Sequence, residues 1–279
     1  MTFRTLIDTD GLARILGSPN VAVVDCRFDL ANTAAGEAAY AEGHIPGAVY
    51  AHLDRDLSAP KTGANGRHPL PAPGVAAATF GRMGIGPGVQ VVAYDQDSGM
   101  YASRLWWMLR WLGHDAVAVL DGGFTRWRGE LRPLSTEVPA VEPRPFVAMP
   151  RNSMVVAAVD IPAVTAGGST LVDARAPERF RGEVEPLDPV AGHIPGAVNH
   201  FFGRNLAHGH FKSPDDLREG FRESFGDIPG DRIVCYCGSG VTACHNILAL
   251  EHAGVTGVRL YPGSWSEWVA DTSRGVEKG

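Results

Sequence analysis

Short runs of apolar residues alternate along the chain with segments in which apolar residues recur every three or four positions. The short runs have the length and composition of buried strands, and they are found at 21–24, 89–94, 170–172 and 232–236. Helical spacing follows in 105–112 and again in 241–248, and Gly113 and Gly254 stand where those helices should end. Strands that alternate with helices predict an α/β fold, in which a parallel sheet carries helices on both faces.

The two halves of the chain repeat one another. The segment EGHIPGAV at 42–49 recurs as AGHIPGAV at 191–198. Further pairs recur in the same order, namely VVDCR at 23–27 with LVDAR at 171–175, VAY at 92–94 with VCY at 234–236, Gly113 with Gly254, and Trp127 with Trp268. Matches in a constant order indicate a duplicated domain rather than chance. Because Arg27 and Arg175 follow an aspartate in both halves, we expect them to form structural ion pairs.

A proline-rich segment joins the two repeats. Residues 131–150 read LRPLSTEVPAVEPRPFVAMP and show little helical or strand spacing. Proline-rich segments of this kind are extended and semi-rigid, as expected of an interdomain linker. The sequence therefore predicts a first domain over 1–135, a linker over 136–149 and a second domain over 150–279.

Composition and charge argue against membrane and nucleic-acid partners and agree with two globular domains. The chain has 279 residues, of which 44% are hydrophobic and 20% are charged, as is usual for soluble globular proteins. No apolar run reaches the roughly 18 residues that span a membrane, and the N-terminus lacks a secretory pattern, so we expect a cytoplasmic protein with no membrane partner. The net charge is −6 and no basic run is present, which argues against a nucleic-acid partner.

The candidate chemistry is concentrated in the segment IVCYCGSGVTA at 233–243. A strand should end near Tyr236 and a helix should begin near Val241, so Cys237 opens the short turn between them. In parallel α/β sheets, active sites lie beyond the carboxyl ends of the strands, which is where this turn falls.

The residues after Cys237 are suited to holding an anion. Gly238 and Gly240 permit positive φ and carry no side chain, so successive backbone N–H groups can point inward. With the N-terminus of the following helix, these donors would form an anion cradle, to which Ser239 and Thr242 add hydroxyl groups. A thiol at its centre is favoured as the thiolate, the nucleophilic form of cysteine.

Three other interpretations of this segment compete. Ligand types for zinc are present in Cys235, Cys237, Cys244 and His245. Their spacing is not that of usual zinc sites, so we expect no metal and no other cofactor. A phosphatase of the Cys-x₅-Arg type needs an arginine where Ala243 stands, because that arginine holds the phosphate. A non-enzymatic binding module is the third alternative, and the intact loop argues against it.

The doubled HIPGA segment, the Asp-Ala-Arg segment at 173–175 and the loop CGSGVT at 237–242 resemble the tandem rhodanese family of sulfurtransferases. The resemblance extends over nearly the whole chain and implies two rhodanese-like domains, each a parallel sheet flanked by helices. It also implies a catalytic second half and an inactive first half, in agreement with Asp95, which stands where the repeat places Cys237. The loop looks most like the 3-mercaptopyruvate branch, because the thiosulfate branch usually carries charged residues there.

The resemblance also implies roles for single residues. Gly238, Gly240, Val241 and Thr242 would line the substrate loop. Arg179 would bind the substrate anion, unless it is an exposed surface arginine, and His44 would form a relay with Ser239. A structural turn explains His44 equally well, because His193 repeats it. An acid for the relay is not clear near 29–33, and the family's second arginine is replaced within 185–189 (EPLDP).

The function predicted from these residues is sulfur transfer by double displacement. Cys237 would take sulfur from a small anionic donor, 3-mercaptopyruvate or thiosulfate, and carry it as a persulfide. A thiol, cyanide or a thioredoxin-like protein would then accept it. The alternative is that thiosulfate-to-cyanide transfer is the main activity.

Overall fold

The computed structural model describes residues 2–279, which form two compact units. The first unit takes the chain up to Ser58 together with 71–151 and 208–211. The second takes 59–70, 152–207 and 212–279. The predicted α/β class, with a parallel sheet in each half, is confirmed.

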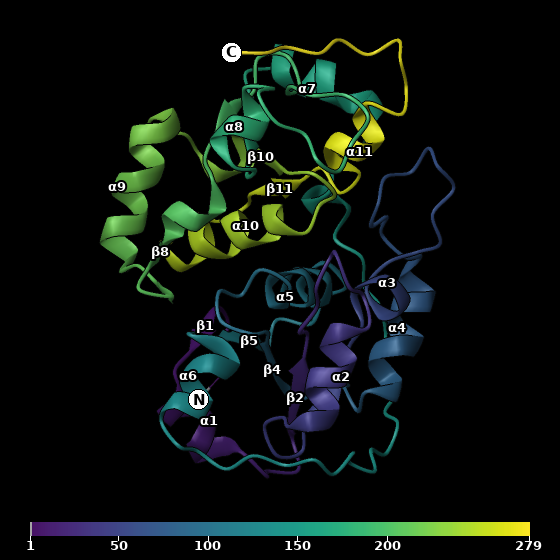
Figure 1. Ribbon diagram of the computed structural model, residues 1–279, viewed down its shortest axis with the longest axis vertical. Coiled ribbons are helices and arrows are strands. Elements are labelled where there is room, and N and C mark those ends of the chain that lie inside the picture. The colour runs from purple at the N-terminus through teal and green to yellow at the C-terminus, as the bar shows by residue number, and fades with distance from the viewer. Residues whose placement is uncertain (1) are drawn as a thin grey trace. The chain divides into compact units, whose positions relative to one another are not determined.

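The first unit is built on a five-stranded sheet (Figure 1). Its strands run parallel in the order β1 (Leu6–Ile7), β5 (Val117–Leu120), β4 (Gln90–Tyr94), β2 (Val21–Asp25) and β3 (Val49–Tyr50). The helices are α1 (Thr9–Ile15), α2 (Ala35–Glu42), α3 (Leu53–Asp56), α4 (Pro73–Arg82), α5 (Ala102–Trp111) and α6 (Gly123–Gly129). Adjacent parallel strands are therefore joined through helices, as the alternating pattern predicted.

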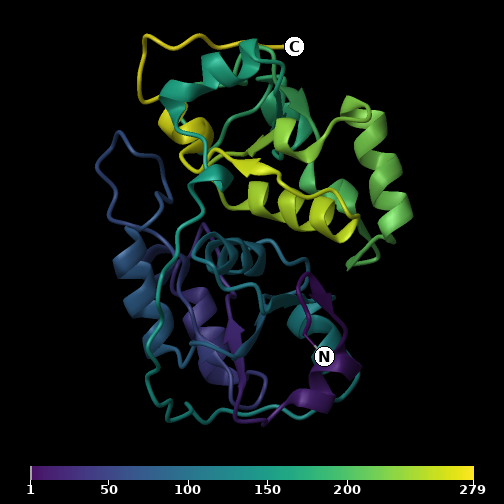
Figure 2. The ribbon, with the colours of Figure 1, turned by 180° about the vertical axis from the view of Figure 1, so that it is seen from behind.

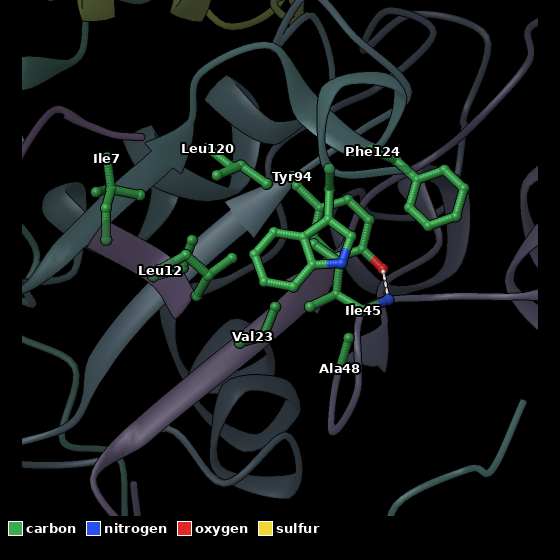
Figure 3. Packing of buried hydrophobic residues seen from close by; sticks show 11 residues of the cluster. Ile7, Leu12, Val23, Ile45, Ala48, Tyr94, Leu120 and Phe124 are labelled. Carbon is green, nitrogen blue, oxygen red and sulfur yellow. Dashed lines mark hydrogen bonds between the residues drawn. The ribbon is translucent and has the colours of Figure 1, made fainter. Parts of the chain in front are cut away.

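One core of the first unit lies between the sheet and the helices α1 and α6 (Figure 3). Val23 and Tyr94 come from the central strands, and Phe124 comes from α6. The Tyr94 hydroxyl accepts a hydrogen bond from the Ile45 backbone N–H at 3.2 Å, drawn as a dashed line in Figure 3. This contact fixes the repeated HIPGA turn to the central strand of the sheet.

The second unit has a four-stranded parallel sheet in the order β11 (Arg259–Leu260), β10 (Ile233–Tyr236), β6 (Thr170–Asp173) and β7 (Val198–Asn199). Its α-helices are α7 (Ile161–Ala166), α8 (Pro177–Phe180), α9 (Pro214–Phe225), α10 (Thr242–His252) and α11 (Ser264–Trp268). Short 3-10 helices cover Asn152–Met154, Ala158–Asp160, Phe202–Asn205 and Gly230–Arg232, and β8 covers Leu206–Ala207. The strand β9 (His210–Phe211) falls within the stretch 208–211 that belongs to the first unit.

Both faces of the second sheet are covered. Figures 1 and 2 show α9 and α10 side by side, and α10 packs against β10. Val234 and Tyr236 join Trp265 of α11 in a core on one face. Cys235 alternates with them along β10 and so points to the other face. Every residue of 243–250 in α10 is buried, so the helix that follows the cysteine turn is held firmly in place.

The two units repeat the same internal contacts, which confirms the duplication. Arg27 pairs with Asp25 at 2.6 Å, and Arg175 pairs with Asp173 at 2.6 Å. In the second unit the Tyr236 hydroxyl also accepts the Ile194 N–H at 3.2 Å, as Tyr94 does in the first. The predicted structural ion pairs are therefore present in both halves.

The compact units differ from the contiguous segments predicted from the sequence. Residues 59–70 belong to the second unit, although they come from the first half of the chain. The predicted linker 136–149 runs along the first unit, where the N–H of Arg144 donates to the carbonyl of Gly81 at 2.9 Å. In the described part of the chain, no helix combines the length and apolarity that a membrane span needs.

Candidate active site

The cysteine turn lies directly beyond the carboxyl end of β10, as the sequence predicted. Its backbone is tied to the start of α11. The Cys237 N–H donates to Ser264 Oγ at 3.1 Å, and the Cys237 carbonyl accepts the Trp265 N–H at 2.9 Å. The Gly238 carbonyl accepts the Ser266 N–H at 2.9 Å. These three bonds hold the turn in one conformation.

Part of the predicted cradle is visible around the sulfur. The Gly240 N–H donates to Cys237 Sγ at 3.1 Å, and only 2% of Cys237 is exposed. Gly240 has φ +77°, and a Cβ there would lie 2.2 Å from the Pro262 carbonyl oxygen, so no side chain is tolerated. Val241 is buried, and Thr242 opens α10.

Gly238 serves the turn in a different way from Gly240. The prediction of positive φ holds for Gly240 and not for Gly238. A Cβ on Gly238 would instead lie 2.7 Å from Nη2 of Arg67 and 3.5 Å from Nη2 of Arg179. Its missing side chain therefore leaves room for two guanidinium groups beside the cysteine turn.

Ser239 is paired with His68. Its Oγ lies 2.7 Å from His68 Nδ1, and the two residues are 7% and 3% exposed. Since a hydroxyl both donates and accepts, the pair can pass a proton between oxygen and imidazole. His68 reaches Ser239 because residues 59–70 belong to the second unit.

The prediction that His44 forms a relay with Ser239 is wrong. His44 Nδ1 and Nε2 lie 2.8 and 3.1 Å from the backbone oxygens of Tyr40 and Glu137, and its ring stacks on Tyr40. His193 does the same in the second unit, with Nδ1 2.8 Å from the Phe180 oxygen and its ring stacked on Phe180. The repeated histidine therefore holds the HIPGA turn in both halves.

Arg179 extends from α8 to the cysteine turn, where the sequence placed it. Its Nη2 donates to Glu185 Oε1 at 2.7 Å, and its Nη1 lies 3.7 Å from the position of a Gly238 Cβ. Burial alone would raise the pKa of Glu185, but the hydrogen bond and charge of Arg179 outweigh it and lower that pKa. Arg181, two residues further along the chain, instead pairs with the exposed Glu183 at 2.7 Å.

Sequence reasoning missed a second arginine at the turn. Arg67 forms an ion pair with Asp188, whose side chain is 3% exposed. Burial raises the pKa of Asp188, while the hydrogen bond from Arg67 opposes that rise. His68 and Arg67 share a signal that was available in the sequence, since neither belongs to a segment that the second half repeats. A residue needed at only one active site has no reason to recur.

The first unit carries a closed version of the same turn. The Asp95 carboxylate accepts N–H bonds from Gly99, Tyr101 and Ala102 at 2.9, 2.7 and 3.1 Å. Gly99 has the same φ, +77°, as Gly240. Burial raises the pKa of Asp95 although these N–H groups oppose it. In the first unit, the backbone N–H groups of this turn are thus occupied by the chain's own carboxyl group.

The remaining cysteines are buried, and burial raises the pKa of Cys26 and of Cys235. Cys244 Sγ donates to the Gly240 carbonyl at 3.3 Å. Across residues 2–279, no three His, Cys, Asp or Glu side chains gather in a way that could hold a metal ion.

Two parallel-sheet repeats, a cysteine cradled in one of them and an aspartate in its place in the other define a two-domain sulfurtransferase. A model of the rhodanese-like domain matches residues 8–130 and 161–271. The chain belongs to the rhodanese family.

Known members resemble the chain over 94% to 100% of its length. A "probable 3-mercaptopyruvate sulfurtransferase" of Pseudomonas aeruginosa is 46% identical over 283 residues and covers 100% of both chains. A "putative thiosulfate sulfurtransferase SseB" of Mycobacterium tuberculosis is 39% identical and covers 94% of this chain and 92% of its own. The crystal structure of the Escherichia coli 3-mercaptopyruvate sulfotransferase SseA matches with a TM-score of 0.81 at 31% identity, covering 94% of this chain and 99% of that one.

Proposed function

We propose that this sulfurtransferase takes sulfur from 3-mercaptopyruvate onto Cys237 and passes it to a thiol. The observation that carries the proposal is the Ser239–His68 pair, 2.7 Å apart, on the turn whose Gly240 N–H contacts the Cys237 sulfur. The P. aeruginosa relative, whose printed name gives 3-mercaptopyruvate as substrate, supports the same donor.

The first half-reaction breaks the carbon–sulfur bond of the donor. The Cys237 thiolate attacks the donor sulfur, and the electron pair of the C–S bond leaves on the three-carbon fragment as the pyruvate enolate. That enolate needs a proton to become pyruvate, and Ser239 backed by His68 would supply it. In the second half-reaction the acceptor thiolate attacks the outer sulfur of the persulfide and releases Cys237 as thiolate. Cyanide and a thioredoxin-like protein are further candidate acceptors.

Charge favours 3-mercaptopyruvate over thiosulfate. Thiosulfate would bring two negative charges close to a thiolate, and both would need neutralisation. The arginines at the turn are already matched by buried acids, since Arg67 pairs with Asp188 and Arg179 with Glu185. A donor with one carboxylate remote from its sulfur fits such a balanced site better. We therefore expect a higher kcat/KM for 3-mercaptopyruvate.

Two measurements test this function. Mass spectrometry of the intact protein after donor treatment should show one added sulfur atom that cyanide removes. Cys237→Ser should lose that addition, whereas Cys244→Ser, which removes a nearby buried thiol, should keep it. Donor preference follows from kcat/KM with both donors side by side. Sulfur on Cys237→Ser protein would contradict the assigned carrier, and a clear preference for thiosulfate would contradict the assigned donor.

A further inference from the structure

The backbone of Arg67 is fixed to the same segment that fixes the cysteine turn. The Arg67 N–H donates to Ser266 Oγ at 3.0 Å, and the Ser266 N–H in turn donates to the Gly238 carbonyl. Gly66 has φ +82°, and a Cβ there would lie 2.9 Å from the Gly263 carbonyl oxygen. The next residue, His68, is bonded to Ser239. The backbone of Arg67 is therefore held at a fixed position relative to the cysteine turn.

The two nitrogens at the end of Arg67 face different partners. Nη1 binds the buried carboxylate of Asp188, and Nη2 lies 2.7 Å from the position of a Gly238 Cβ. Nη2 takes part in none of the hydrogen bonds or ion pairs found for Arg67 among residues 2–279. The side chain is 24% exposed, so a ligand over Gly238 can reach this nitrogen.

Asp188 connects this guanidinium to Arg179. Its Oδ1 binds Arg67, and its Oδ2 lies 3.5 Å from Arg179 Nη2. Arg179 is 18% exposed and approaches Gly238 with Nη1 at 3.7 Å from a Cβ position. One buried carboxylate thus orients two guanidinium groups toward the same small space beside the cysteine turn.

We propose that Arg67 is a second residue that binds the donor carboxylate, and that Asp188 is the residue that positions it. This inference rests on the proposed use of a carboxylate-bearing donor. The two oxygens of one carboxylate would be shared between Arg67 and Arg179, because planar guanidinium groups present paired N–H donors to such a group. The resemblance to the family left this chain without a second arginine in 185–189, and the segment 59–70 supplies one from elsewhere.

The inference predicts unequal effects at the two ends of the ion pair. Arg67→Ala removes a donor and leaves the Asp188 charge buried beside the incoming anion, so KM for 3-mercaptopyruvate should rise about 10- to 100-fold. Arg67→Lys keeps a charge for Asp188 but not the fork, and should give an intermediate KM. Removing the unpaired charge as well, in Arg67→Ala with Asp188→Asn, should recover part of the loss. Arg222→Ala, which removes an exposed arginine on α9, is the matched control.

A binding measurement separates this inference from the proposed function. The neutral reagent iodoacetamide alkylates Cys237, and pyruvate, which keeps the carboxylate but lacks sulfur, should protect it in the native protein. Arg67→Ala should weaken protection about tenfold or more, when protection is taken for each protein as the ratio of its own alkylation rates without and with pyruvate. Unchanged protection and unchanged KM in Arg67→Ala would overturn the role of Arg67 and leave the sulfurtransferase function standing. If 3-mercaptopyruvate proves a poor donor, the protection arm still reports whether Arg67 binds a carboxylate.

Discussion

Replacing Gly240 by alanine tests how the backbone of the cysteine turn supports its chemistry. Comparison with an alanine at another left-handed glycine separates the cost of the backbone conformation from effects specific to the turn. Gly240 has φ +77°, and a Cβ there would lie 2.2 Å from the Pro262 carbonyl oxygen. Gly196 offers a matched control within the same unit, because it has φ +75° and a Cβ there would have no atom within 4 Å.

The two substitutions share one cost and differ in another. Alanine in the left-handed region costs about 1–2 kcal/mol, and Gly196→Ala should lose about that much stability. At Gly240 the new methyl group meets backbone, which cannot rotate away, so overpacking adds about 1–3 kcal/mol. The shift also moves the N–H that donates to Cys237 Sγ at 3.1 Å. A hydrogen bond to a charged group is worth about 1.5–3 kcal/mol, which corresponds to a loss of about 10- to 100-fold in kcat/KM.

Urea unfolding gives the stability difference, and stopped-flow measurement of persulfide formation gives the kinetic one. We expect Gly240→Ala to lose more stability than Gly196→Ala. We also expect persulfide formation in Gly240→Ala to be about 10- to 100-fold slower. Equal stability losses in the two variants, together with a normal rate of persulfide formation in Gly240→Ala, would refute both the steric and the hydrogen-bond argument.

Further predictions concern histidines. His68→Ala should lower kcat for 3-mercaptopyruvate by about 100-fold, the usual size of a general acid–base contribution. His44→Ala should lower stability and leave kcat nearly unchanged. If steady-state assays gave the reverse result, His44 would be the relay residue after all. Burial lowers the pKa of His200 to about 4. The unfolded chain, with a pKa of about 6.5, then binds more protons than the folded one between these values, so stability is lost as the pH falls through this window. Because His200 is 1% exposed, the free energy of unfolding of the native protein should fall by about 2 kcal/mol more than that of His200→Gln between pH 7 and pH 5. Urea unfolding at the two pH values measures this, and an equal fall in both proteins would contradict it.

Much of the fold could be predicted from the sequence because its signals are local. Alternation of strand and helix patterns, together with the internal repeat, predicts two parallel α/β units. The turn after β10 is also a local feature, since Cys237, Gly238 and Gly240 follow a strand and precede a helix. The lack of a cysteine in the corresponding turn of the first half could be recognised in the same way, from Asp95 at the position that the repeat assigns to Cys237.

Only the tertiary structure decided which residues from the first half of the chain reach the candidate active site in the second unit. The pattern of apolar residues places strands and helices, but it does not say where an irregular segment such as 59–70 packs. That segment brings Arg67 to Asp188 and His68 to Ser239, pairs separated by more than a hundred positions along the chain. The family resemblance assigned the relay role to His44, but a residue that recurs in both halves is better explained by a structural role that both halves need. The cysteine turn is encoded within a few consecutive residues, whereas the arginines and the histidine beside it are brought there by long-range packing.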